Sequence, residues 1–395
     1  MMKKITFFLF IFHILHLSAQ EAIWWKTPTV SPEIYDNHMV TFRLVAPRAK
    51  EVLLVGEFLP PSFVVRDGIT TQMTGTAALK RGADGVWTYT TPRPMDPGYY
   101  NYNFVVDGLT ITDPSNIHST RDVVKTSSIF FIEGGWSDYY KDQDVPHGTL
   151  SHVWYHCDKT EKDRRLTVYT PAGYGEFGIR YPVLYLLHGM GGDEDSWVTL
   201  GRAVQILDNL IAQGKAKPMI VVMTNSYMDL QAAPGHGPEG FIKPDLELSP
   251  SYDGVFEESF PSIIRYVDKA YHTIPRKQSR AIAGLSMGGF HAMQISRAYP
   301  DYFDYVGLFS AAVGHEAGDV PIYQNPMEKL RTQFSKKPAL YWIAIGKEDF
   351  LYDANAEYVR LLETNRFRHE YFETDGGHTW YNWRFYLTEF LRRLF

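Results

Sequence analysis

One serine lies between two glycines, at the junction of an apolar run and a helix-like run. The segment Arg280–Phe290 reads RAIAGLSMGGF, and its G-x-S-x-G core spans Gly284, Ser286 and Gly288. This pattern is typical of a sharp strand-to-helix turn, because the tight backbone leaves no room for a Cβ on either side of the serine. Such a turn lifts the hydroxyl clear of the sheet, so Ser286 is a candidate nucleophile toward a carbonyl carbon.

The hydrophobic pattern divides the chain into two parts. From 20 to 135, short β-type runs alternate with turn signals such as Asp96-Pro97-Gly98, which predicts a small immunoglobulin-like β-sandwich. A polar connector follows at 136–146. From 147 to 395, strands that are apolar on both faces alternate with helical segments. This predicts an α/β hydrolase fold, a mostly parallel, doubly wound sheet with helices on both faces.

Individual elements can be placed from the same pattern. The β-type runs of the first part lie at 39–44, 51–55, 85–90 and 99–106. In the second part we expect strands at 181–187, 219–223, 280–285, 305–310 and 340–346, with helices at 204–211 and 256–267. The segment Met228–Asp253 is rich in glycine, proline and acidic residues, and it is long enough to form a wall or lid over a site.

Charge and the first residues limit the possible partners and location. The formal net charge of −6, without a long basic run, argues against a nucleic-acid partner. Residues 1–19 combine a charged start, an apolar run and a small residue, Ala19, as a secretory signal peptide does. No cysteine for a lipid anchor lies near Ala19, and no later run has the length of a membrane span. We therefore expect a secreted or periplasmic protein of undetermined oligomeric state, free of the membrane once the signal is removed.

A serine nucleophile needs a histidine base. His378 is the strongest candidate, because the glycine-rich loop 375–380 precedes the final helix and lets the side chain bend over the carboxyl edge of the sheet. His315 follows a strand end and is the main alternative. His291, inside the helix after the serine, and His369, in a charged run, are weaker candidates.

The base must in turn be oriented by a carboxylate, which precedes the histidine in chain order in this fold. Asp349 suits this role because it lies in the loop at the carboxyl end of the strand 340–346, where catalytic groups gather. Glu348 and Asp353 remain possible.

Two backbone donors are needed for the oxyanion. Met287, the residue after the nucleophile, supplies one N–H. The loop His188-Gly189-Met190-Gly191-Gly192 follows an apolar strand, and its glycines allow close approach to a ligand, so the Met190 N–H is the candidate for the second. No Cys/His spacing or acidic cluster typical of a metal site is present, and the chemistry requires neither metal nor other cofactor.

Aromatic residues cluster near these loops and suit a planar acyl group. They are Trp197, Tyr227, Tyr252, Phe350, Trp380 and Trp383. Of these we expect Trp197, Tyr227 and Trp380, together with His188, to contact the substrate.

From about Pro146 onward the chain resembles carbohydrate esterase family 1, the feruloyl and acetyl xylan esterases related to esterase D. The resemblance rests on the segments 145–149, 164–171, 181–189, 284–289 and 377–378. The first part is similar to a family 48 carbohydrate-binding module or an E-set domain, on the segments 42–47, 85–87 and 113–116.

The resemblance implies a triad of Ser286, Asp349 and His378, with oxyanion donors at Met190 and Met287. It also implies a secreted serine esterase that acts on feruloyl esters of a plant cell-wall polysaccharide such as arabinoxylan, or on its feruloylated oligosaccharides. An acetyl xylan esterase, a siderophore trilactone esterase or an acyltransferase would use the same triad. A non-catalytic glycan-binding protein is the alternative from another class.

Overall fold

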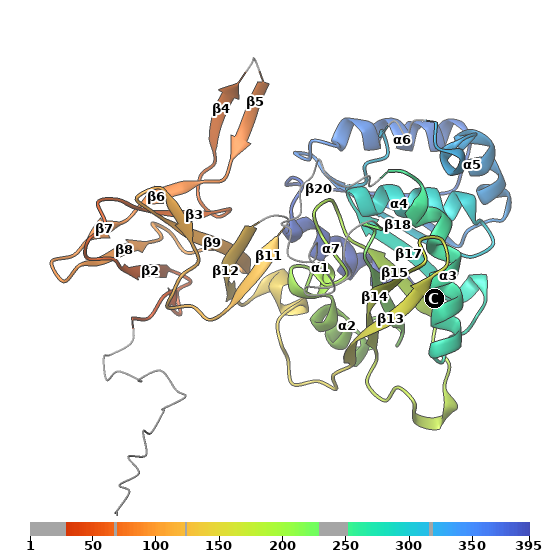
Figure 1. The fold of residues 1–395 in the computed structure, drawn as a ribbon, viewed down its shortest axis with the longest axis horizontal. Helices are drawn as coiled ribbons and strands as arrows, with labels where there is room; N and C mark the ends of the chain where they lie inside the picture. The colour runs from red at the N-terminus through yellow and green to blue at the C-terminus, as the bar shows by residue number, and fades with distance from the viewer. Residues whose placement is uncertain (1–28, 67–68, 123–124, 229–251, 316–318) are drawn as a thin grey trace, which may run out of the picture.

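The computed structural model describes residues 29–66, 69–122, 125–228, 252–315 and 319–395. The expected signal segment, 1–19, and most of the expected covering segment, 229–251, lie outside the described residues. Figure 1 shows a β-rich N-terminal part beside a larger part in which helices surround a central sheet. No helix in the described ranges is both long enough and apolar enough to cross a membrane.

The N-terminal part, called the β domain here, consists mainly of two antiparallel sheets. One has the order β1-β2-β8-β7 and the other β11-β12-β9-β3-β6, with β10 paired to β9. The strand β3 shows why the sheets pack, because Val52 and Leu54 are buried while Leu53 and Val55 are only partly so. Both sheets contribute to one hydrophobic core, so the expected β-sandwich is confirmed. The strands are β1 (Glu33–Ile34), β2 (Val40–Val45), β3 (Val52–Gly56), β4 (Ser62–Arg66), β5 (Ile69–Met73), β6 (Thr76–Ala78), β7 (Lys80–Arg81), β8 (Val86–Thr90), β9 (Gly98–Val106), β10 (Leu109–Ile111), β11 (Ser119–Asp122) and β12 (Lys125–Ile132).

The C-terminal part, called the hydrolase domain here, contains an eight-stranded sheet in the order β13-β14-β16-β15-β17-β18-β19-β20. The six strands from β16 to β20 along this order are parallel, and β13 and β14 extend one edge antiparallel. The expected α/β hydrolase fold is thus present. Its strands are β13 (Thr149–Cys157), β14 (Lys162–Thr170), β15 (Val183–Leu187), β16 (Ile220–Thr224), β17 (Arg280–Leu285), β18 (Tyr305–Phe309), β19 (Leu340–Gly346) and β20 (Glu370–Thr374).

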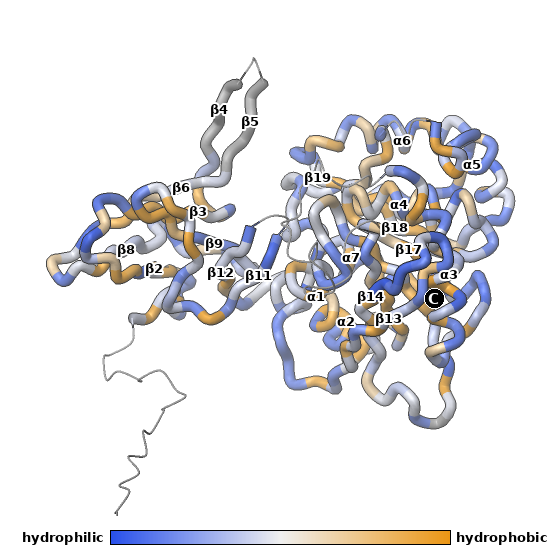
Figure 2. Tube along the Cα trace, in the orientation of Figure 1, coloured by the Kyte–Doolittle hydropathy of each residue, from blue (hydrophilic) through white to orange (hydrophobic). Residues whose placement is uncertain are grey.

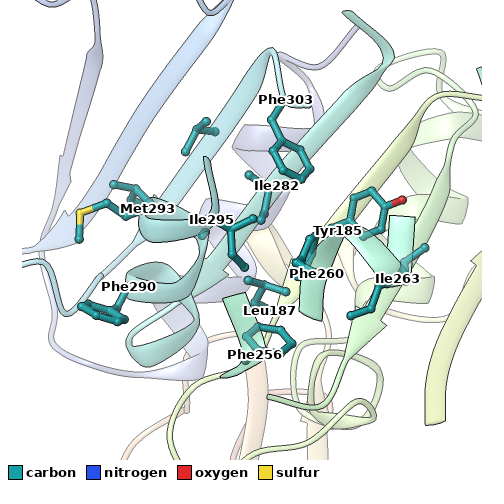
Figure 3. Packing of buried hydrophobic residues seen from close by; sticks show 14 of the residues in the cluster. Tyr185, Leu187, Phe256, Phe260, Ile263, Ile282, Phe290, Met293, Ile295 and Phe303 are labelled. Carbon is teal, nitrogen blue, oxygen red and sulfur yellow. The ribbon is translucent and has the colours of Figure 1, made fainter. Parts of the chain in front are cut away.

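Helices cover both faces of this sheet. Its central strands are therefore buried along their whole length. Figure 2 shows these strands as hydrophobic. On one face, Phe256 and Phe260 of α3 and Phe290 of α4 pack against Tyr185 and Ile282 of the sheet (Figure 3). On the other face, α2 and α7 complete a second core. The α-helices are α1 (Ser196–Thr199), α2 (Ala203–Ala212), α3 (Val255–Ala270), α4 (Met287–Ala298), α5 (Pro326–Ser335), α6 (Tyr352–Thr364) and α7 (Trp380–Leu391).

The connector between the domains is packed rather than loose. It begins with a 3₁₀ turn, η1 (Gly135–Tyr139), and Tyr140 is buried in the core beside α2 and α7. The side chain of Asn209 on α2 donates hydrogen bonds to the carbonyls of Tyr139 and Lys141, at 3.0 and 2.9 Å. The polar composition of residues 136–146 predicted a connector, and no local sequence pattern indicates its contacts with α2, far along the chain.

Candidate active site

The serine turn has the strained geometry that its sequence predicts. Ser286 joins β17 to α4 with φ 53° and ψ −118°, in a region that non-glycine residues rarely adopt. The flanking glycines are required by space, because a Cβ on Gly284 would lie 2.3 Å from the carbonyl oxygen of Gly288. A Cβ on Gly288 would lie 2.3 Å from the carbonyl oxygen of His188. The turn and the loop that begins at His188 are therefore in direct backbone contact.

The expected base and acid are brought together. The Nδ1 of His378 lies 3.0 and 2.9 Å from the two carboxylate oxygens of Asp349, which follows β19. Asp349 is 4% exposed, and its Oδ1 also accepts a hydrogen bond from the N–H of Leu351. A carboxylate at Nδ1 places the proton on that nitrogen and leaves Nε2 free to act as a base. His378 and Ser286 line the same cavity.

The alternative histidines occupy other surroundings. His291 is buried within α4, with Nδ1 2.7 Å from the carboxylate of Glu257. His315 is stacked on Tyr252, with the ring centroids 3.8 Å apart. His369 donates from Nδ1 to the Phe367 carbonyl at 2.8 Å.

The alternative acids also have surroundings that differ from those of Asp349. Glu348 is exposed, and Asp353 lies in the first turn of α6. Asp349, by contrast, contacts both the histidine ring and the backbone of its own loop. The structure therefore favours Asp349 as the carboxylate that orients His378.

The glycine-rich loop after β15, residues 188–193, will be called the oxyanion loop. A Cβ on Gly189 would lie 3.4 Å from the Cβ of Ser286, so this loop borders the nucleophile. The carbonyl of Gly189 accepts hydrogen bonds from His188 Nδ1 at 2.7 Å and from the N–H of Gly192 at 3.1 Å. In a trans peptide the C=O and N–H point in opposite directions. These two bonds therefore turn the N–H of Met190, which belongs to the same peptide unit, away from the interior of the loop.

The other expected donor, the N–H of Met287, belongs to the first residue of α4. The N–H of Met287 has no acceptor within the helix, as is general for the first turn, and the helix dipole favours negative charge at this end. Met287 itself is fully buried, whereas the side chain of Met190 is exposed and lines the cavity.

The side chain of His188 is a neutral ring, and its hydrogen bonds hold the oxyanion loop in place. Its Nδ1 donates to Gly189, and its Nε2 accepts a hydrogen bond from the Ser226 N–H at 3.0 Å. Burial lowers the pKa of His188 to about 4, because the ring loses the hydration that would stabilise its charged form. The ring therefore stays neutral near pH 7, which the two opposite hydrogen-bonding roles require.

The cavity at this site has a volume of about 490 Å³. It is bordered by the candidate nucleophile and base, and much of its wall is apolar. The apolar wall comprises Met190, Tyr252, Leu285, Phe350, Trp380 and Trp383.

The structure places the four expected substrate-contact residues in different surroundings. Trp380 lines the cavity, but His188, Trp197 and Tyr227 do not. These three side chains are at most 6% exposed and are used by the protein itself. The indole N–H of Trp197 donates to the carbonyl of Leu187, and the Tyr227 hydroxyl accepts from the N–H of Gly191. Nearness in sequence to an active-site loop did not reveal which side of the loop each ring would face.

Two cavity residues come from the β domain and were not expected. Glu57 follows β3, and Asp122 ends β11; both line the cavity that contains Ser286. Partial loss of hydration at the cavity wall raises the pKa of both carboxyl groups. Their sequence surroundings contain no motif, because their position depends on how the two domains dock.

The described ranges hold no group of three or more His, Cys, Asp or Glu side chains arranged to bind a metal ion. The arrangement that is present can instead position a hydroxyl, a histidine–carboxylate pair and two backbone N–H groups around one carbonyl carbon.

Comparisons with known proteins agree with this chemistry. A family model described as "Putative esterase" matches residues 158–394. The endo-1,4-beta-xylanase/feruloyl esterase of Xylanibacter ruminicola is 36% identical over 289 residues, which are 71% of this chain and 36% of that protein. The chain thus spans about a third of the length of this curated relative.

Solved structures share the fold. A CE1 ferulic acid esterase from Anaeromyces mucronatus, solved in complex with ferulic acid, superposes with a TM-score of 0.53 at 27% identity, covering 65% of this chain and 94% of that one. The enterobactin esterase of Shigella flexneri covers 90% of this chain and 92% of its own, with a TM-score of 0.61 at 18% identity. That likeness extends the shared fold to the β domain. Because the family match spans more than half of the length of this chain, the chain belongs to the esterase family, and it has an α/β-hydrolase fold.

Proposed function

We propose that this esterase hydrolyses feruloyl esters of a plant cell-wall polysaccharide such as arabinoxylan. The observation that carries the proposal is the apolar, aromatic wall of the roughly 490 Å³ cavity beside Ser286. An acetyl group would leave most of this space empty, whereas a planar hydroxycinnamoyl group can fill it against Phe350, Trp380 and Trp383. The names of the Xylanibacter and Anaeromyces proteins support the same acyl group.

The proposed reaction proceeds through an acyl-serine intermediate. His378 Nε2 takes the proton of Ser286 Oγ as this oxygen attacks the ester carbonyl carbon. The N–H groups of Met190 and Met287 stabilise the resulting oxyanion, and Asp349 stabilises the protonated imidazole. Collapse breaks the bond to the sugar oxygen, which receives the proton from Nε2. Water then attacks the acyl group by the same route, releasing ferulate and restoring Ser286.

The test is a substrate panel with mass-spectrometric identification of the released acid. We expect the protein to release ferulate from feruloylated arabinoxylan and from methyl ferulate. Ser286→Ala should lower kcat by about 10³-fold or more, because it removes the nucleophile. Ser335→Ala, at the end of α5, is the matched control and should retain activity.

Two results would contradict this proposal at different points. Release of acetate alone, from acetylated xylan, would refute the feruloyl assignment while leaving the serine mechanism intact. Undiminished ester hydrolysis by Ser286→Ala would refute the mechanism.

Export is part of the same proposal. We expect the secreted protein to begin at or near Gln20, and N-terminal sequencing of protein from the culture medium or periplasm checks this. A retained Met1 would contradict cleavage.

A further inference from the structure

The strand β11 of the β domain reaches the hydrolase domain next to the oxyanion loop. It contacts α1, which begins at Ser196 shortly after that loop, and Figure 1 shows it on the side of the β domain that faces α1 and α7. The guanidinium of Arg121 forms an ion pair with the carboxylate of Asp193. Its Nη1 also lies 3.5 Å from the carbonyl oxygen of Gly191, in donor geometry. The Arg121 side chain of the β domain thus contacts two residues of the oxyanion loop.

The oxyanion loop depends on such contacts because its own sequence restrains it little. Three of its six residues are glycines, and Gly191 adopts φ 76°, a conformation that costs other residues free energy. Within the hydrolase domain, His188 holds the Gly189 carbonyl and Tyr227 holds the Gly191 N–H. Arg121 contacts the other polar backbone group of Gly191, its carbonyl oxygen.

Asp122, the next residue of β11, connects the same strand to the other side of the site. Asp122 lines the same cavity as Trp380, which lies two residues after His378. Trp380 in turn meets Trp383 edge to face, and Trp383 meets the ring of His378 in the same way. β11 therefore contacts the oxyanion loop through Arg121 and borders the cavity that contains His378 through Asp122.

We propose that the β domain is a working part of the active site, and that Arg121 is a positioning residue which fixes the oxyanion loop for catalysis. This inference rests on the proposed acyl-serine mechanism and goes beyond glycan binding as the role of the β domain. The Arg121 and Asp193 side chains are 38% and 26% exposed, so their pairing contributes little to folding. The Arg121–Asp193 pair acts instead on the transition state, in which the Met190 N–H must lie within hydrogen-bonding distance of the oxyanion.

The test compares Arg121→Gln with the wild type and with Arg48→Gln, an exposed arginine between β2 and β3 of the same domain. We expect Arg121→Gln to lower kcat about 10- to 100-fold, because loss of a complete oxyanion donor costs about 10²- to 10³-fold and loss of its support costs less. KM should stay within about twofold, because the oxyanion forms only after binding. Arg121→Lys keeps the charge opposite Asp193 and should recover part of the rate.

Both methyl ferulate and 4-nitrophenyl acetate serve as substrates, so the result does not depend on the feruloyl assignment. The rate of Ser286 labelling by a fluorophosphonate, whose phosphoryl oxygen also needs the oxyanion donors, is the third readout and should fall in parallel. Thermal unfolding should match the wild type within about 2 °C, since both side chains of the pair are partly exposed.

Two outcomes would overturn the inference. A kcat for Arg121→Gln within twofold of Arg48→Gln would show that the loop needs no support from the β domain. A raised KM with unchanged kcat would show that Arg121 binds substrate instead. If the wild type releases no ferulate while 4-nitrophenyl acetate and the fluorophosphonate still react, the substrate proposal fails and the role of Arg121 is still measured.

Discussion

Among single residues, His188 links electrostatics to the geometry of the site most directly. The ring donates from Nδ1 and accepts at Nε2, so protonation would remove the acceptor used by Ser226. The sequence pattern placed His188 in the right loop but suggested a contact with substrate. In the structure the ring is instead buried, which lowers its pKa to about 4, and it forms hydrogen bonds with the backbone of Gly189 and Ser226.

This residue should make stability depend on pH in a defined window. The His188 pKa is about 4 in the folded protein, against 6.5 for an unperturbed histidine, so between these values the unfolded chain binds more protons. The contribution of His188 is thus complete above pH 6.5 and is lost as the pH falls toward 4, by about 3 kcal/mol. Urea unfolding at pH 7 and about pH 4.5 measures most of this loss. His188→Asn retains a donor near Gly189 but cannot titrate, so it should lack this part of the pH dependence; equal slopes in both proteins would contradict the assignment.

Between secondary-structure elements, α4 can contact the oxyanion loop because Gly288 has no side chain. The first turn of α4 lies so close to the end of β15 that the carbonyl oxygens of Leu187 and His188 occupy the place of a Cβ on Gly288. The G-x-S-x-G motif identified this glycine and gave the correct general reason for it. The partner that it approaches, the oxyanion loop, is known only from the fold.

Gly288→Ala should therefore damage both stability and activity. The added Cβ would lie 2.3 Å from the His188 carbonyl oxygen and 2.6 Å from that of Leu187, and backbone atoms cannot move away cheaply. We expect a loss of about 3 kcal/mol in the free energy of unfolding, and a fall in kcat because the two oxyanion donors are pushed apart. Gly314→Ala is the control, since its Cβ would meet nothing nearer than 3.1 Å and should cost less than about 1 kcal/mol. Equal unfolding midpoints for the two variants in denaturant would contradict this account.

For the molecule as a whole, a buried arginine fastens the two domains. Arg384 on α7 is 3% exposed and donates to the carbonyls of Leu200 at 2.7 Å and Tyr99 at 3.2 Å. Its guanidinium also lies over the rings of Tyr99 and Tyr140, 5.2 and 5.0 Å from their centroids. The Tyr99 hydroxyl completes the junction by donating to the carbonyl of Thr199. This junction holds the β domain where its strand β11 reaches the site.

Arg384→Met should loosen this junction. The substitution keeps much of the side-chain volume but leaves buried carbonyls without a donor, which we expect to cost about 2–4 kcal/mol. The variant should unfold at a lower temperature and be cleaved faster by protease between the domains than Arg393→Met, a partly exposed control at the end of the chain. If the two variants unfold at the same temperature and resist protease equally, Arg384 does not fasten the domains.

Local patterns in the sequence were enough to predict the features that depend on neighbouring residues. The glycines around Ser286, the apolar strands, and the loop positions of Asp349 and His378 follow from short-range sterics and hydrophobic periodicity. The structure brings this acid and histidine into contact. Which aromatic rings face the cavity, and the arrival of β-domain residues such as Arg121 at the active site, could be learned only from the folded chain. These contacts join residues far apart in the sequence, 72 positions for Arg121 and Asp193 and 285 for Tyr99 and Arg384, so they exist only once the two domains have docked.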